Sequence, residues 1–162
     1  MTFDNFTIKA QQAVQHAIDK ATGNGSQAVG AVHLLAGVLS VGENVTQFLF
    51  GKTGVNERTL QSAVDNELKS YPRVSGGGQP YLDNDANEVL QKSQTIAQKE
   101  GDAYVGLEPL LMALFEVKST ASQMLKDAGL TADALRAAVK ELRGGQKATS
   151  QSSEDTYQAL AK

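Results

Sequence analysis

The tripeptide Gly51-Lys52-Thr53 most resembles a chemical motif in this chain, since it matches the end of a phosphate-binding loop. The complete pattern also needs a glycine at position 46, where this chain has Thr46, and a strand that leads into the loop. Neither feature is present in the sequence. We therefore interpret the tripeptide as the end of a helix, with Gly51 and Gly54 supplying the turn.

Nucleophiles and metal ligands are equally scarce. The chain has no cysteine and two histidines, which excludes a thiol nucleophile, a disulfide and a Cys-bearing zinc site. We expect His16, off the apolar face of its helix, to face water, and His33 to lie at a helix start. A Ser-His-acid site needs three groups within reach of one another, and the sequence does not indicate such a set. We predict no catalytic residue, no metal and no cofactor in this chain.

Composition restricts the class of protein further. The 162 residues carry 15 Lys and Arg against 18 Asp and Glu, a net charge of -3 without the basic stripe of nucleic-acid binding proteins. The longest apolar runs, 34–39 and 110–115, are far shorter than the roughly 18 residues of a membrane span. Residues 1–6 lack a signal-peptide pattern. We expect a cytoplasmic domain that contacts neither nucleic acid nor membrane.

The elements that would position any site are helices. Apolar residues recur at helical spacing from Ala10 to Ala21, after Thr7 as an N-cap and before Gly23-Asn24-Gly25. This pattern predicts a helix at about 8–22, and no segment alternates as a strand would. We predict an all-α fold with further helices near 31–41, 44–52, 56–70, 83–100, 107–117, 119–128 and 132–143.

The two halves of the chain repeat the same pattern. A shift of 76 residues pairs Ala10 with Ala86, and after one deleted residue a shift of 75 pairs Leu60 with Leu135. Each half alone would leave an apolar face uncovered. The duplication therefore predicts two four-helix units that pack about a pseudo-twofold axis.

The duplication also sets the expected boundaries. Repeat one covers about 1–70, a Gly- and Pro-containing connector covers 71–80, and repeat two covers about 81–143. Together they form one domain, 1–144. Residues 145–162 are polar, and we expect a linker stub, leading to a first ATPase module, that contributes almost nothing to stability.

The repeated motif resembles a known family. Each half has a helix with the pattern A-x-x-(A/V)-(V/L), then G-(S/D), then a helix with x-(H/P)-L-L-x-x-(V/L)-(L/F). This resembles the Clp repeat, the N-terminal domain of Clp-class AAA+ unfoldases. Phe6-Thr7 opens the first helix, and the pair R-G-G-Q and E-D-x-Y-x-A-L after residue 142 resembles the junction found in ClpB-type disaggregases.

The resemblance implies a function. The domain would bind exposed apolar segments of unfolded or aggregated proteins. The isolated domain would be a monomer. The full-length protein would be a homohexamer that binds ATP in other domains and works with the DnaK-type chaperone system. The alternative is the adaptor-docking N-domain of a protease-coupled Clp unfoldase, which shares the repeat. A free-standing small enzyme would instead show turnover by this chain alone.

The resemblance also implies a site. In the family, the positions that match Thr7, Asp102 and Glu108 are associated with the substrate-engaging surface, and a shallow hydrophobic groove binds apolar segments. The groove residues would be Leu90, Ile96, Tyr104 and Leu110, with Lys92 and Pro109 interrupting it. The alternatives are that these residues form the core of repeat two, and that Thr7 and Glu108 only complement helix ends. We expect Asp102 and Glu108 to be surface residues that matter little for stability.

Overall fold

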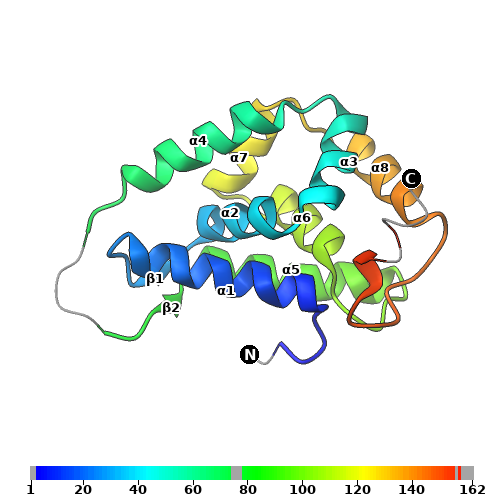
Figure 1. Ribbon diagram of the computed structural model, residues 1–162, viewed down its shortest axis with the longest axis horizontal. Helices are drawn as coiled ribbons and strands as arrows, with labels where there is room; N and C mark the ends of the chain where they lie inside the picture. The colour runs from blue at the N-terminus through cyan, green and yellow to red at the C-terminus, as the bar shows by residue number, and fades with distance from the viewer. Residues whose placement is uncertain (1–2, 74–77, 156, 158–162) are drawn as a thin grey trace.

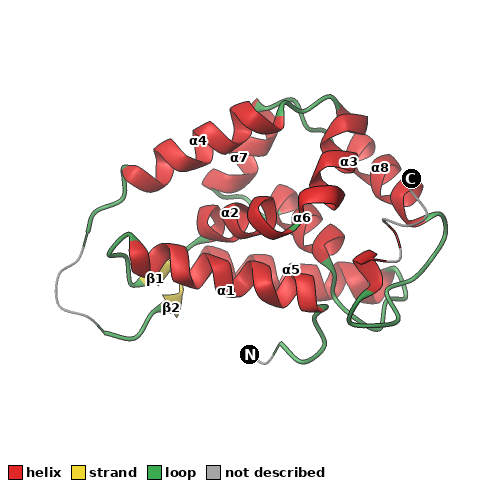
Figure 2. Ribbon diagram, viewed as in Figure 1, coloured by secondary structure: helices red, strands yellow, loops and turns green. Residues whose placement is uncertain are grey.

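The computed structural model describes residues 3–73, 78–155 and 157, which are mostly helical (Figure 2). The helices of repeat one are α1 (Ile8–Gly23), α2 (Ala31–Val41), α3 (Glu43–Thr53) and α4 (Glu57–Lys69). Those of repeat two are α5 (Asn84–Lys99), α6 (Leu107–Glu116), α7 (Thr120–Asp127) and α8 (Ala132–Arg143). The all-α prediction is confirmed, because every predicted helix is present in its predicted place.

Local sequence explains where these helices begin and end. The side chain of Thr7 accepts a hydrogen bond from the backbone of α1, and Asp83, its equivalent in repeat two, caps α5 in the same way. Gly54 ends α3 in the left-handed conformation, with φ of 76°. The prediction that Gly51 helps to supply the turn is wrong, because Gly51-Lys52-Thr53 is the last turn of α3.

The two repeats pack against each other through equivalent pairs of helices. Within each repeat the first two helices pair, α1 with α2 and α5 with α6. Between repeats, α3 packs against α8, α4 packs against α7, and α2 meets α6 in the middle of the molecule (Figure 1). Each contact has its counterpart when the two repeats are exchanged, which is the arrangement expected about a pseudo-twofold axis. Each repeat thereby covers the apolar face of the other.

Two short parallel strands, β1 (Ala28–Val29) and β2 (Tyr81–Leu82), were not predicted. Val29 pairs with Leu82, and the isolated bridge between Phe6 and Val105 is its equivalent at a shift of 76 residues. Both pairings join the chain just before a helix of one repeat to the chain just before a helix of the other. Two-residue strands are too short to show an alternating pattern in the sequence.

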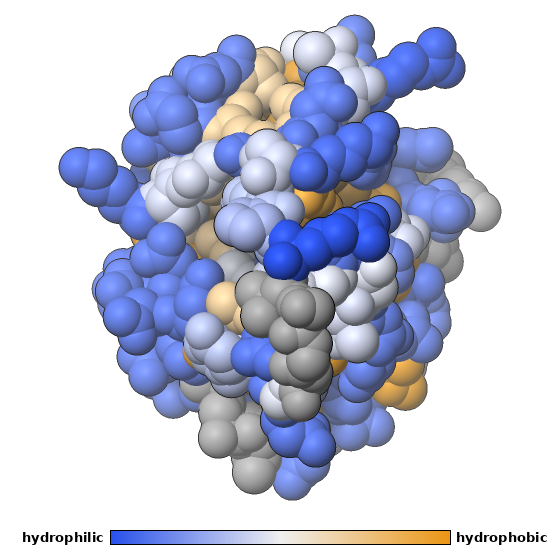
Figure 3. Space-filling model, turned by 90° about the vertical axis from the view of Figure 1, so that its left-hand side faces the viewer, coloured by the Kyte–Doolittle hydropathy of each residue, from blue (hydrophilic) through white to orange (hydrophobic). Residues whose placement is uncertain are grey.

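Of the predicted connector, 71–80, residues 71–73 and 78–80 lie at one end of the molecule (Figure 1), and residues 74–77 fall outside the described part of the chain. Figure 3 shows this end, where hydrophilic side chains dominate and apolar ones appear in recesses between them. Among the described helices, none alone is long and apolar enough to cross a membrane, and α2 and α3 pass that test only as a pair bent by 103°.

The backbones of α1 and α2 approach closely at Gly37. A methyl group added at this glycine would collide with the backbone carbonyl of Ala13. The equivalent positions in repeat two hold Ala113 and Val89, both fully buried, so side chains separate the backbones of α5 and α6 there. Close packing in repeat one therefore depends on a residue without a side chain.

We predict that Gly37→Ala lowers the free energy of unfolding by about 1–3 kcal/mol through this collision. Helix preference alone predicts the opposite, because alanine is better than glycine in a helix by about 1 kcal/mol. The matched control is Gly51→Ala in α3, where an added methyl meets nothing within 4 Å. Urea denaturation should show the control unchanged or more stable. A Gly37→Ala protein as stable as the parent would contradict the close approach.

Candidate functional site

A buried ion cluster lies where α8 ends. The guanidinium of Arg143 binds Asp102 through two contacts of 2.9 Å, from Nη1 to Oδ1 and from Nη2 to Oδ2. Its Nε donates to Oε1 of Glu108 at 3.0 Å. The side chains of both carboxylates are fully buried. This guanidinium therefore joins the end of α8 to the loop before α6 and to the first turn of α6.

A third carboxylate reaches the same place from the C-terminal segment. Oε2 of Glu154 accepts hydrogen bonds from the Thr7 hydroxyl at 2.7 Å and from the backbone N–H of Leu107 at 3.0 Å. The ring of Tyr157, also buried, lies 5.4 Å from the guanidinium of Arg143. We call these groups the Arg143 cluster, formed by Thr7, Asp102, Glu108, Arg143, Glu154 and Tyr157.

The prediction that residues 145–162 form a linker that buries little is wrong, because Ala148, Ser153, Glu154 and Tyr157 are buried. Ala148 is fully buried, its carbonyl accepts from the backbones of residues 103 and 104, and its N–H donates to Asp102 at 2.9 Å. The N–H of Ile8 donates to the carbonyl of Gln151. The domain therefore extends past 144. Residues 156 and 158–162 lie outside the described part of the chain.

The cluster holds more negative than positive charge. Burial raises the pKa of Glu154 to about 7, and the nearby charge of Glu108 adds to the shift, while the bond from Thr7 opposes it. Burial likewise raises the pKa of Glu108, against the attraction of Arg143. Burial alone would lower the pKa of Arg143, but the carboxylates raise it. Protonation of Glu154 relieves the excess charge.

The expected surface positions of Thr7, Asp102 and Glu108 are therefore corrected. Thr7 and Glu108 have no exposed area, and the carboxylate of Asp102 is buried against Arg143. Removing one partner of a buried ion cluster costs about 3–5 kcal/mol, because the other charge stays buried without compensation. These residues are structural in the folded chain, and the helix-capping alternative describes Thr7 correctly.

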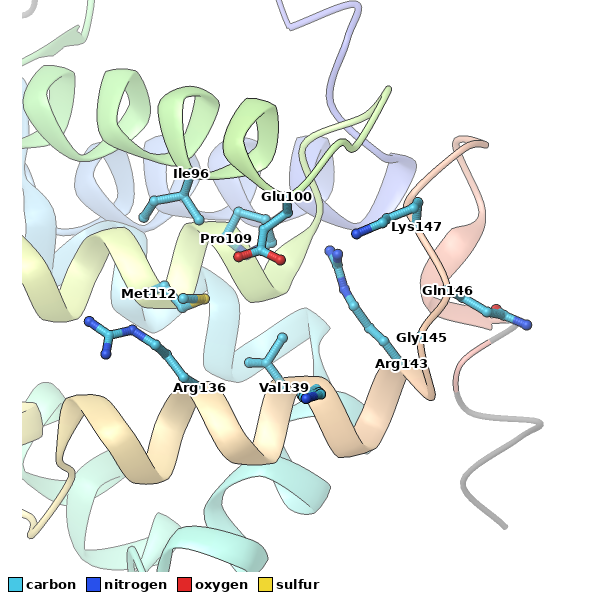
Figure 4. A pocket seen from close by; sticks show the side chains of 11 residues that line it. Ile96, Glu100, Pro109, Met112, Arg136, Val139, Arg143, Gly145, Gln146 and Lys147 are labelled. Carbon is cyan, nitrogen blue, oxygen red and sulfur yellow. The ribbon is translucent and has the colours of Figure 1, made fainter.

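A groove of about 400 Å³ opens beside the cluster, over α6 and between α5 and α8 (Figure 4). We call it the α6 groove. Residues 145–147 form one wall, and Arg143 belongs to both the groove and the cluster. The four apolar residues that form its floor are Ile96, Pro109, Met112 and Val139.

The groove contains few of the residues predicted for it. Ile96 lines it, and Pro109 contributes to its floor instead of interrupting it. Leu90 and Leu110 are fully buried core residues, as the alternative interpretation had it, and Tyr104 is half-buried away from the groove lining. A direct part of any of them in binding stays a prediction. Comparing the repeats position by position would have indicated Met112, where repeat one has alanine.

Repeat one has a different surface at the equivalent place. The ring of Tyr71, which corresponds to Gln146 of the groove wall, packs against His33 with centroids 5.6 Å apart. Nδ1 of His33 accepts from the N–H of Gly30 at 3.0 Å, and burial lowers the pKa of this histidine. A hollow of about 350 Å³ beside these rings has a lining of mixed polar and apolar residues that includes Asp83, and it shares only His33, Tyr71 and Pro72 with the positions equivalent to the α6 groove. The equivalents of the four floor residues are Lys20, His33, Ala36 and Val64.

Histidine and carboxylate side chains do not gather into a metal site in the described residues, where no group of three or more has suitable geometry. His16 is half-buried on α1, so our expectation that it faces water is only partly met. The geometry instead offers a groove with an apolar floor.

Comparison with known proteins agrees with this architecture. A family model for the Clp repeat (R) N-terminal domain matches residues 5–128. The chain belongs to this family. The chaperone protein ClpB of Bacteroides thetaiotaomicron is 52% identical over the whole of this Clp N-domain, and that of Porphyromonas gingivalis is 43% identical. The predicted resemblance is confirmed.

The Clp N-domain spans 19% of the length of either relative. The crystal structure of the Hsp104 N-terminal domain from Candida albicans has the same fold, with a TM-score of 0.82 over 93% of this chain and 99% of that one. At 24% identity, this second likeness establishes the fold alone.

We predict that ending the Clp N-domain at Gly144 lowers its melting temperature by several degrees. The truncation removes Glu154, Tyr157 and the hydrogen bonds of Ala148, each bond contributing about 1 kcal/mol, and 1 kcal/mol corresponds to about 2–8 °C. Thr149→Ala is the control, since it changes an exposed side chain of the same segment. Thermal unfolding followed by circular dichroism measures both. An unchanged melting temperature would restore the linker interpretation.

We also predict that stability falls as the pH rises through about 7. The pKa of Glu154 is about 7 in the folded chain and 4.5 ordinarily, so between these values the folded chain binds more protons than the unfolded chain. The free energy of unfolding should therefore decline across that window, on the order of 1–3 kcal/mol.

Glu154→Gln cannot titrate at this position and should show a smaller decline. The pKa of His33 is lowered by burial, so below its ordinary value of 6.5 this histidine makes stability rise with pH. This contribution is the same in the parent and in the variant. Urea denaturation at about pH 5, 6, 7 and 8 makes the comparison. The same decline in parent and variant would show that Glu154 is not the group responsible.

Proposed function

We propose that this Clp N-domain engages substrates for an ATP-dependent protein disaggregase, by binding exposed apolar segments of unfolded or aggregated proteins in the α6 groove. The apolar floor of the groove is the observation that carries the proposal. Ligand sites in proteins have mostly apolar walls, a few polar groups and volumes of about 300–1,000 Å³. The equivalent positions of repeat one hold Lys20 and three buried residues, His33, Ala36 and Val64, so the shared fold does not require this apolar set.

We propose that the Arg143 cluster acts on binding by positioning the groove. Asp102 and Glu108 hold Arg143, which lines the groove. Asp102 also holds the N–H of Ala148, next to the wall formed by residues 145–147. Thr7 contributes through Glu154. The family association of Thr7, Asp102 and Glu108 with substrate engagement would then come from the shape of the groove, without direct contact.

The rest of the proposal concerns a complete protein of which this chain would be one part. It would be a cytoplasmic homohexamer that binds ATP in other domains and works with the DnaK-type chaperone system, and the isolated Clp N-domain would be a monomer without bound cofactor. The similarity of this chain to chaperone protein ClpB of two organisms supports this assignment. For the same reason we keep the adaptor-docking N-domain of a protease-coupled Clp unfoldase as the second candidate function.

We predict that Met112→Gln weakens binding of a fluorescein-labelled peptide with a Leu-Phe-Leu core and serine flanks by about fivefold or more. The substitution puts an amide where the groove offers an apolar surface, at unchanged net charge. Fluorescence anisotropy with the 162-residue chain measures the affinity. Met124→Gln is the matched control, because Met124 is also a partly buried methionine but lies on α7, outside the groove lining. Equal affinity of parent and Met112→Gln would exclude the α6 groove as the site.

A further inference from the structure

The rim of the α6 groove is basic, although the whole chain has a net charge of -3. Arg136 and Lys140 of α8 and Lys147 of the wall line the groove, against one carboxylate outside the cluster, Glu100. The charge of Arg143 does not add to this excess, because Asp102 and Glu108 lie against it. Figure 4 shows Arg136 and Lys147 at opposite ends of the apolar floor, with Glu100 above it.

The rim cations are accessible. The side chain of Arg136 is 58% exposed, and its contact to the exposed Asp133 is long, at 3.4 Å. Lys140 and Lys147 are exposed and form no ion pair with any residue in the described part of the chain. A bound carboxylate would therefore not have to displace an existing buried partner.

The shared fold does not require these charges. The positions in repeat one that correspond to Arg136, Lys140 and Lys147 hold Gln61, Asp65 and Pro72. These three equivalent positions thus carry one negative charge in repeat one and three positive charges in repeat two. Charges arranged around an apolar site select partners of complementary charge more than they add to affinity.

We propose that the α6 groove prefers apolar segments flanked by aspartate or glutamate, so that the apolar run lies on the floor and the carboxylates reach the cations at its two ends. This inference rests on the proposed function and names the class of segment that the groove selects. An unfolded chain offers many apolar runs, and the rim would favour those with acidic neighbours over those with basic ones.

Three fluorescein-labelled peptides test the proposal. They share a Leu-Phe-Leu core and differ in having two glutamates, two serines or two lysines on each side. We expect the glutamate peptide to bind the 162-residue chain about 2- to 10-fold more tightly than the serine peptide, and the lysine peptide to bind most weakly. The differences should shrink between about 50 and 500 mM NaCl, because exposed charges are screened.

The double variant Lys140→Glu with Lys147→Glu should reverse this order. The matched control is Lys69→Glu with Lys118→Glu, which changes the net charge equally. Lys69 lies in the last turn of α4 as Lys140 does in that of α8, and Lys118 is exposed in a loop as Lys147 is. The control should keep the order of the parent. Circular dichroism melting curves confirm that both variants are folded.

Each other outcome overturns a defined part of the argument. If the three peptides bind equally, and Met112→Gln weakens all of them, the charge preference is wrong and the proposed function stands. If the order persists in the Lys140→Glu, Lys147→Glu variant, the preference arises elsewhere on the surface and the inference is wrong. If no peptide binds, or Met112→Gln changes nothing, the proposed function and this inference both fail.

Discussion

The single positive charge of Arg143, buried among carboxylates, is the constraint on which this structure most depends. Three acidic side chains, Asp102, Glu108 and Glu154, meet in one interior region with one guanidinium between two of them. Such an arrangement is stable only when its geometry is nearly complete, because each buried charge left without a partner costs several kcal/mol. The end of α8, the start of α6 and the C-terminal segment must therefore keep their relative positions.

Two helix starts complete this arrangement. Glu154 accepts hydrogen bonds from the N–H of Leu107 at the start of α6 and from the hydroxyl of Thr7 at the start of α1. The hydroxyl oxygen of Thr7 also caps α1, by accepting from a backbone N–H of its first turn. Backbone N–H groups at helix starts stabilise negative charge. Gly106 leaves the necessary room, since a methyl group there would lie 3.0 and 3.1 Å from oxygens of Glu154 and Glu108. The excess of carboxylates is thus partly offset by the backbone.

Comparing the two repeats distinguishes the features that the shared fold requires from those that only one repeat has. Both repeats have the same helix order, a side-chain cap at the equivalent position before α1 and α5, and equivalent parallel bridges. Where repeat one has Val32 and Leu68, repeat two has Glu108 and Arg143. The ion pairs of Arg143, the apolar floor and the basic rim therefore have no equivalent in repeat one, and Arg143 ties the groove wall to the interior.

The sequence by itself determined the eight helices, the duplication and the family, because helical periodicity and caps are local and a repeat shows in one chain. It did not determine the environment of Asp102, Glu108 and the C-terminal segment. The hydrogen bond between Thr7 and Glu154 joins residues 147 positions apart, and those of Arg143 span 35 and 41 positions. A polar segment such as 145–155 has the composition of a linker, and only its docking on α6 and α1 makes it part of the domain. Burial of polar groups depends on which partners the tertiary structure brings within hydrogen-bond distance, and no local pattern encodes that.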